Sequence, residues 1–576
     1  MNKRITVLVP DALPFQPKRL SIMLTVVALT FWAVSVTQAK LVLDDWGIIH
    51  SLPVTYLFGV GFLTIAAAIL WLSKESHNFL MGFQLFFFIA MLWATPLLLG
   101  TTLPFTRYGY GYFTNTQYII NYGHLNIVTQ WLHSWPGFSI FQTALVEIPG
   151  IKNTDAMLLW SPLIIQFLMV IPFFLFSKNI INRSNYCWAA VWVFYLFDHT
   201  NLLYFSNQVM ALFFFWLIIT ILIKSARGLE PLSNAYEILL MILAAGLILT
   251  HLLTSIACLF VLVSLLLSRK LRNLNIVLLF TIFTLAWFIF VATGYFQYMF
   301  SQIGSQILRI NLLWKMEIAP SQNVGSFGQI MTVNITILLS VLMCVIALVG
   351  LIISRKNKNI NDNTVLFMVV GVSFLLFLAV SIYSGSMIER VYVFILPLLA
   401  YFSIKSLSKK IMAVIFVALL VIVIPISVVA IFANQNEETI TLSQIGYWHF
   451  VEEKTTEGYF TGGGMSPTWS LGFISVPDSH VYIQGVTQYS LNAANLWMNA
   501  LTTNQWPQAG ENAYVTLSSF EKVIYQEGFN QNQFVPNLRS WLNDSTNYNL
   551  IFNSGDVTAY MHEVTWVNSC SMFFEK

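Results

Sequence analysis

Charged residues are scarce in this sequence. Only 9% of the 576 residues are charged, whereas 57% are hydrophobic, and the mean hydropathy is +0.71. Soluble domains carry about 25% charged residues, so the composition excludes a soluble single-domain protein and predicts a multi-pass membrane protein. The net charge of +3 gives no reason to expect a nucleic-acid partner.

Cysteine is rare as well. The four cysteines lie far apart and show neither a disulfide framework nor the spacing of a zinc site. No internal repeat is visible, and no small-residue cleavage site followed by a polar region marks a removable signal peptide. The basic segment 1–20 is therefore expected to be a cytoplasmic tail in front of an uncleaved first span.

Long apolar runs occupy most of the chain up to residue 433. A run of about 17–25 apolar residues is long enough to cross a bilayer as a helix. The sequence predicts a mainly α membrane bundle of about thirteen such spans. They are expected near 21–39, 53–73, 79–100, 158–177, 186–199, 204–224, 235–251, 252–268, 274–294, 329–353, 364–384, 390–406 and 411–433.

Lysine and arginine in the short loops all fall on the side of the N-terminus. Because cytoplasmic loops are enriched in these residues, the N-terminus is predicted to be cytoplasmic. The chain then divides into a transmembrane domain, 1–433, with a large outer loop at 101–157, and an extracytoplasmic domain, 434–576. The second domain is predicted to be small and mixed α/β, because 442–453 has helical spacing and 548–561 alternates around a turn like a β-hairpin.

The outer loop is unusually aromatic for a connecting segment. Between Arg107 and Ile148 it contains five tyrosines and two tryptophans, together with charged and imidazole side chains. Tyrosine and tryptophan favour the membrane–water interface. Two interpretations remain open: the loop lies in the interface with aromatic anchors, or it forms the wall of a polar cavity that opens there.

Ionisable and polar side chains also gather at the outer ends of the predicted spans. Such groups are costly inside a membrane and are usually functional, although each has a simple alternative as a helix cap or an interfacial anchor. The candidates are Asp44, Asp45, Arg107, Tyr110, His124, His133, Trp135, Glu147, Asp198, Gln208, His251, Glu389 and Arg390. Their common side predicts one site at the outer face.

Four short motifs stand out along the chain. They are the acidic pair Asp44-Asp45, the segments 121–126 (NYGHLN) and 133–138 (HSWPGF), the segment 204–212 (YFSNQVMAL) and the hairpin 551–560 (IFNSGDVTAY). Together they resemble the GT-C superfamily of integral-membrane glycosyltransferases, in particular its archaeal and bacterial multi-pass branch. The oligosaccharyltransferase motif Trp-Trp-Asp does not occur in the sequence, which argues against transfer of a whole N-glycan.

The resemblance implies a GT-C-like fold and a cell-envelope enzyme that moves a sugar from a polyprenyl- or dolichyl-phosphate donor. The acceptor would be a glycan, a lipid or a protein at the outer face. Asp44 or Asp45 would be the catalytic base, with Glu147 and Asp198 as alternatives. Arg107 and Arg390 would hold the phosphate through paired donors.

The remaining candidates would bind the substrate. His124 and His251 would donate further hydrogen bonds, aromatic residues of the outer loop would stack on sugar faces, and the rest would line the site: Tyr110, His133, Trp135, Gln208 and Glu389. The metal requirement is open, although three of the aspartates offer the oxygen ligands that magnesium or manganese prefers.

Three other functions fit the same topology. A polysaccharide polymerase or ligase acting on lipid-linked glycans would share the outer loop chemistry. A transporter or flippase for lipid-linked sugars would place its polar groups near the bilayer midplane and show inverted repeats; neither feature is apparent. A non-enzymatic scaffold or receptor is the third alternative.

Overall fold

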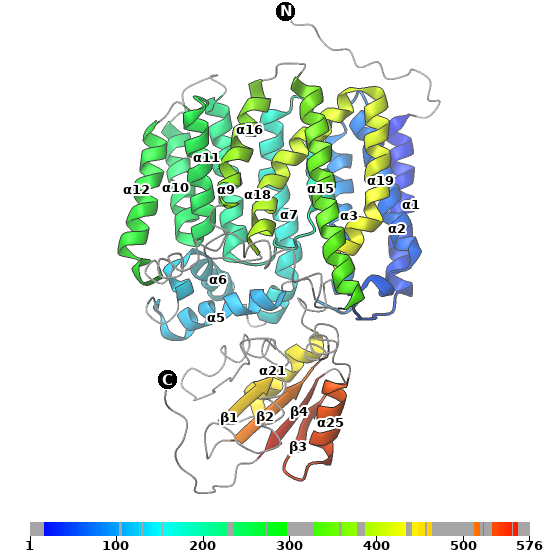
Figure 1. The fold of residues 1–576 in the computed structure, drawn as a ribbon, viewed down its shortest axis with the longest axis vertical. Coiled ribbons are helices and arrows are strands. Elements are labelled where there is room, and N and C mark those ends of the chain that lie inside the picture. The colour runs from blue at the N-terminus through cyan, green and yellow to red at the C-terminus, as the bar shows by residue number, and fades with distance from the viewer. Residues whose placement is uncertain are drawn as a thin grey trace, which may run out of the picture.

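The structure is a computed structural model. It describes residues 16–102, 106–125, 127, 131–151, 154–226, 234–271, 274–295, 326–355, 360–376, 386–433, 441–454, 458–462, 512–518, 522, 533–555 and 557–562. A helical bundle occupies one part of the molecule, and a small sheet with two helices occupies the other (Figure 1).

Long helices run side by side through the bundle (Figure 1). In the described part of the chain, seven helices are long and apolar enough to cross a membrane, and four shorter apolar helices accompany them. The chain is therefore a multi-pass membrane protein, while the number of about thirteen spans stays a prediction. The bundle helices are α1 (Pro17–Gln38), α2 (Val54–Leu72), α3 (Asn78–Trp93), α7 (Thr154–Ile180), α8 (Ser184–Phe197), α9 (Asn207–Ala226), α10 (Asn234–Thr250), α11 (Leu252–Leu267), α12 (Leu274–Phe290), α15 (Phe327–Arg355), α16 (Ile360–Ser373), α18 (Ser386–Ser403) and α19 (Lys410–Phe432).

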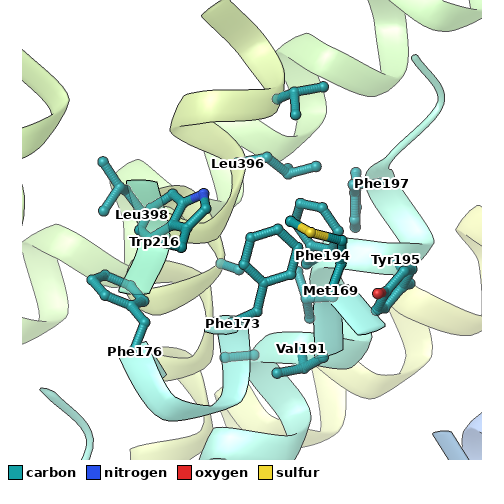
Figure 2. Close-up of a cluster of buried hydrophobic side chains, with 14 of the residues drawn as sticks. Met169, Phe173, Phe176, Val191, Phe194, Tyr195, Phe197, Trp216, Leu396 and Leu398 are labelled. Carbon is teal, nitrogen blue, oxygen red and sulfur yellow. The ribbon is translucent and has the colours of Figure 1, made fainter. Parts of the chain in front are cut away.

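Aromatic side chains fill the centre of the bundle where α7, α8, α9 and α18 meet (Figure 2). The ring of Phe173 lies 4.2 Å from that of Phe194 and 5.8 Å from that of Trp216, measured between centroids. Within a bilayer, helices associate mainly through close packing and hydrogen bonds, because the lipid tails are as apolar as the side chains. This packed centre fixes the end of α8, from which the candidate site begins.

Two helices lie across one end of the bundle, between it and the sheet (Figure 1). They are α5 (Thr106–Tyr122) and α6 (Gly137–Glu147), with the 3₁₀ turn η2 (Trp131–Ser134) between them. The segment that the sequence presents as an aromatic loop therefore contains two helices, which we call the platform. The platform contacts the bundle closely: a Cβ at Gly137 would lie 2.7 Å from the hydroxyl of Thr250 at the end of α10.

The C-terminal part contains a four-stranded sheet in the order β1-β2-β4-β3. Strand β1 (Gly458–Gly462) is parallel to β2 (Asn512–Leu517), which is antiparallel to β4 (Thr558–His562). Strand β3 (Asn549–Asn553) pairs with β4 as an antiparallel hairpin, which confirms the prediction for 548–561. Helix α21 (Leu442–Lys454) confirms the helical prediction for 442–453, and α25 (Phe534–Asp544) buries Leu538 and Leu542 against the sheet.

The sheet and the platform share a second hydrophobic cluster. Ile445 and Tyr447 of α21 pack in the same buried group as Phe113 and Phe138 of the platform. A chain of polar contacts lies beside it: the Tyr110 hydroxyl donates to Asp155 Oδ1 at 3.2 Å, and His449 Nε2 lies 2.5 Å from Asp155 Oδ2. Helix α21 therefore joins the sheet to α5 and to the start of α7.

Candidate functional site

The segment 198–206, between α8 and α9, is buried although it is not helical. Asp198 and Ser206 are fully buried, and Leu203 is 1% exposed. Connecting segments usually lie on the surface, because a buried one must find partners for its backbone groups. At membrane depth, such backbone occurs only where protein surrounds it or where it lines a cavity. This segment therefore marks the candidate site.

Three residues from distant parts of the chain are coupled electrostatically in this region. Arg390, in the first turns of α18, interacts electrostatically with Tyr204 and with His251. His251 is the single residue between α10 and α11, where its Nδ1 accepts from the backbone N–H of Thr254 at the start of α11. The structure thus brings together two candidates that the sequence separates by 139 positions, 251 and 390, and adds Tyr204 to them.

Two platform tyrosines extend this group. The rings of Tyr108 and Tyr112 lie 6.2 Å and 6.3 Å from the ring of Tyr204, and a side-chain hydrogen bond joins Tyr112 to Tyr204. The sequence places the two tyrosines four positions apart, which puts them on one face of a helix. We call Tyr108, Tyr112, Tyr204, His251 and Arg390 the tyrosine–arginine cluster.

Asp198 follows the last residue of α8 and is fully buried. Its Oδ1 accepts from the hydroxyl of Thr200 at 2.7 Å, whereas its Oδ2 has no hydrogen-bond partner. The neighbouring His199 stacks on Tyr392 of α18 at 5.0 Å and lies 2.8 Å from the hydroxyl of Ser340 in α15. The Asp198 carboxylate is therefore enclosed by protein. The end of α8 contacts α15 and α18 through the neighbouring His199.

Asp44 and Asp45 lie in the connection from α1 to α2, at the platform end of the bundle (Figure 1). The backbone forms a tight turn that Asp44 closes with Gly47, and Gly47 has φ +60°. Asp44 Oδ2 lies 2.5 Å from His50 Nδ1, and 34% of the Asp44 side chain is exposed. Asp45 has a different environment, because its Oδ2 accepts from the backbone N–H of Gly328 in the first turn of α15 at 3.0 Å.

The imidazole candidates of the platform lie apart from the tyrosine–arginine cluster. His133 is fully buried, with Nε2 3.2 Å from the carbonyl of Asn115, and its ring contacts Tyr118. His124 is exposed and lies 3.3 Å from the Tyr118 hydroxyl. Trp135 is buried at the edge of the Tyr295 ring, 4.8 Å away. The contacts of His124 and His133 lie within the platform, whereas Trp135 packs with Leu252 of α11 and with Ala292.

The other candidates have varied environments. Tyr110 is buried in α5, where burial and the nearby Asp155 raise the pKa of its hydroxyl. Glu147 is exposed at the end of α6, and Glu389 is exposed beside Arg390. Gln208 is buried in the first turn of α9. Arg107 lies in α5, but its side chain lies outside the described residues.

No group of three or more histidine, cysteine, aspartate or glutamate residues suited to a metal ion occurs in the part of the chain that the structure describes. Asp44 and Asp45 follow one another in the chain, but their carboxylates contact His50 and Gly328 respectively. The structure therefore leaves the requirement for magnesium or manganese open, as the sequence does.

No protein-family model matches the chain, and no curated protein matches it. Among solved structures, the chain is similar to the oligosaccharyltransferase of Archaeoglobus fulgidus, tethered with an acceptor peptide containing the NVT sequon, at 10% identity, over 88% of this chain and 73% of that chain, with a TM-score of 0.41. It is also similar to ArnT from Cupriavidus metallidurans bound to undecaprenyl phosphate, at 12% identity, over 94% of this chain and 97% of that chain, with a TM-score of 0.35. These likenesses concern the fold, so we base the function on the residues of this chain.

Proposed function

We propose that this protein is a membrane glycosyltransferase that moves a sugar from a polyprenyl-phosphate donor to an acceptor at the outer face of the membrane. The observation that carries the proposal is the tyrosine–arginine cluster. It combines one guanidinium, one imidazole and three phenols at the bundle end that faces the platform. The motifs that resemble the GT-C superfamily, including the acidic pair and the segment that begins at Tyr204, support the same function.

Arg390 and His251 are suited to the phosphate of the donor. Guanidinium binds phosphate through paired hydrogen bonds in a fixed plane, and charge that is already positioned stabilises a leaving group without reorganisation. Arg390 lies in a half-buried position near the start of α18, where a lipid-borne phosphate at headgroup level would meet it. His251 would donate a hydrogen bond from its other ring nitrogen, since its Nδ1 faces Thr254.

Tyr108, Tyr112 and Tyr204 are suited to the sugar. The centres of the Tyr108 and Tyr112 rings lie 6.2 Å and 6.3 Å from that of Tyr204, and tyrosine offers both an apolar face and a hydroxyl. Stacking on C–H patches and hydrogen bonding to sugar hydroxyls would orient the anomeric carbon toward the acceptor.

Asp44 is our choice for the base, because its carboxylate is partly exposed while Asp198 is enclosed and Asp45 contacts α15. In the reaction, the acceptor hydroxyl oxygen forms a bond to the anomeric carbon as the carbon–oxygen bond to the phosphate breaks. The polyprenyl phosphate leaves with the bonding electron pair, and the acceptor proton passes to the carboxylate of Asp44. Asp45 would position the connection between α1 and α2 against α15.

The same proposal assigns the sides of the membrane. The N-terminus would be cytoplasmic, and the platform and the domain 434–576 would be extracytoplasmic. The contact of α21 with the platform supports a role of that domain beside the site, where it would guide a glycan, lipid or protein acceptor.

Reconstitution of the purified chain in liposomes with a polyprenyl-phosphate sugar tests the proposal. We expect sugar transfer by the wild type, a loss of about 10²–10³-fold in Arg390→Ala and of about 10²–10⁴-fold in Asp44→Asn. Arg355→Ala, at the far end of α15, is the matched control and should transfer normally. Unchanged transfer in both site variants would refute the assignment of the site.

The same assay separates the two nearest alternatives. A polymerase or ligase would lengthen a glycan or move a whole lipid-linked glycan, so the size of the product decides. A flippase would move the intact lipid-linked sugar across the bilayer without breaking the sugar–phosphate bond. We consider it less favoured because the tyrosine–arginine cluster lies at one end of the helices and not at their middle.

A further inference from the structure

A cavity of about 350 Å³ lies between α7, α9 and α10. The end of α7, the end of α9 and the start of α10 lie at the side of the bundle opposite the platform (Figure 1). Pockets that bind small molecules in proteins commonly have about 300–1,000 Å³. Leucine and isoleucine side chains form most of the lining. The polar residues in it are Lys178, Asn179, Thr220 and Lys224.

Asn179 connects α7 to α9, which form two walls of the cavity. Its side-chain amide donates to the carbonyl of Thr220 at 3.0 Å, which ties the end of α7 to α9. Helix α9 also packs against α10, and Leu239 and Leu243 of α10 form the opposite wall. The cavity is therefore built by packed helices, with its walls set by contacts on both sides of α9.

Two lysines line this cavity from different helices. Lys178 lies in the last turn of α7 and Lys224 in the last turns of α9. Lys224 Nζ donates to the Tyr236 hydroxyl at 3.4 Å and lies 5.3 Å from the centre of the Tyr236 ring. In the part of the chain that the structure describes, neither lysine forms an ion pair with a carboxylate.

The nearest acidic side chain of α10 faces elsewhere. Glu237 lines a separate cavity together with residues of α11 and α12, on the other side of α10. Among the residues that the structure describes, the lining of the cavity with the lysines carries two positive charges and no carboxylate. The helix dipole favours a lysine near a helix C-terminus, and this explains the position of each lysine separately. It does not explain why both lysines line the same aliphatic cavity.

We propose that this cavity binds an anionic phospholipid from the leaflet opposite the candidate site. The two ammonium groups would hold the phosphate, and an acyl chain would occupy the aliphatic walls. Basic pockets between helices bind anionic lipid head groups in this manner. A free phosphate ion would use only the lysines, so the aliphatic lining favours the lipid.

The bound lipid would brace α7 against α9 and α10. Both α7 and α9 begin near the platform and end at this cavity. The lipid therefore acts at a distance from the tyrosine–arginine cluster, and the inference stands independently of the glycosyltransferase proposal.

The test uses the full chain reconstituted with phosphatidylglycerol in phosphatidylcholine, followed by native mass spectrometry and melting curves. Each lysine near an anionic headgroup contributes about a fivefold factor in binding, so Lys178→Gln with Lys224→Gln should weaken lipid retention about 25-fold. The variant Lys409→Gln with Lys410→Gln removes two exposed lysines at the same end of the bundle, outside this cavity. It should retain the lipid like the wild type.

A second variant keeps the charges and fills the cavity. Leu239→Trp should exclude the acyl chain and abolish the rise in Tm that phosphatidylglycerol gives the wild type, whereas inorganic phosphate should give the wild type no such rise. Equal lipid retention in the wild type, the cavity-lysine double variant and Leu239→Trp would overturn the proposal. An equal loss in the Lys409 and Lys410 control would also overturn it, because the attraction would then be non-specific.

Discussion

Asp45 Oδ2 accepts a hydrogen bond from the backbone N–H of Gly328 at 3.0 Å, across 283 positions of sequence. The contact ties the connection between α1 and α2 to the first turn of α15. It also leaves no room for a side chain, because a Cβ at Gly328 would lie 2.3 Å from the backbone oxygen of Asp45.

We therefore expect Gly328→Ala to lower the Tm of the protein and to displace the connection between α1 and α2, which carries Asp44. The matched control is Gly61→Ala in α2, where a Cβ would meet nothing within 4 Å. Alanine favours a helix over glycine by about 0.5–1 kcal/mol, so the control should hold or raise the Tm. Thermal unfolding in detergent measures both, and a Tm that is unchanged in Gly328→Ala would contradict the tight contact.

The contact of His449 with Asp155 should couple the C-terminal domain to the bundle. We expect His449→Ala and Asp155→Asn to loosen α21, seen as faster limited proteolysis of the C-terminal domain in the full chain. Contacting residues show interaction energies of about 0.5–3 kcal/mol in double-mutant cycles. Strictly additive effects of the two substitutions would argue against a direct interaction in solution.

Asp198→Asn should separate stability from catalysis. A buried carboxylate oxygen without a partner is unfavourable, so we expect the Tm to hold or rise when asparagine keeps the contact with Thr200. If Asp44 is the base, transfer by Asp198→Asn should stay within a few-fold of the wild type. A loss as large as that of Asp44→Asn would instead favour Asp198 as the catalytic base.

His562 should make the stability of the C-terminal domain depend on pH. Its burial in β4 lowers the pKa of the imidazole below the usual value of 6.5. The folded state then binds this proton less readily than the unfolded state, so the contribution is present above pH 6.5 and is lost as the pH falls through the folded pKa. Melting curves from pH 7.5 to 5 should show this loss in the wild type and a smaller one in His562→Gln, whereas the exposed His124→Gln should behave like the wild type.

Sequence patterns predicted the parts of this fold that depend on local periodicity. The apolar runs predicted a helical membrane bundle, and the alternation at 548–561 predicted the hairpin of β3 and β4, both of which the structure confirms. The high aromatic content of the segment around Tyr108 and Tyr112 favoured an interfacial loop, whereas the structure has helix α5 there. The four-residue spacing of those two residues was the available signal.

The long-range contacts of the candidate site had no such signal. The neighbourhood of His251 and Arg390 depends on how α10, α11 and α18 pack, and the partner of Asp45 lies 283 positions away. The pattern of a single sequence shows the spacing of residues within one helix or strand. Which distant helices contact one another depends on side-chain packing, which that pattern does not show. The functional roles of all the candidate residues remain predictions for the assays above.

The buried segment 198–206 also bears on how the chain is assembled. The carbonyl of Leu203 accepts from Gln166 in α7, and the side chain of Asn201, which has φ +52°, donates to the carbonyl of Ile431 in α19. One of these partners is synthesised before the segment and the other 230 positions later. The segment therefore reaches its final set of hydrogen bonds only after residue 431 has been synthesised, so its packing is completed late in the folding of the chain.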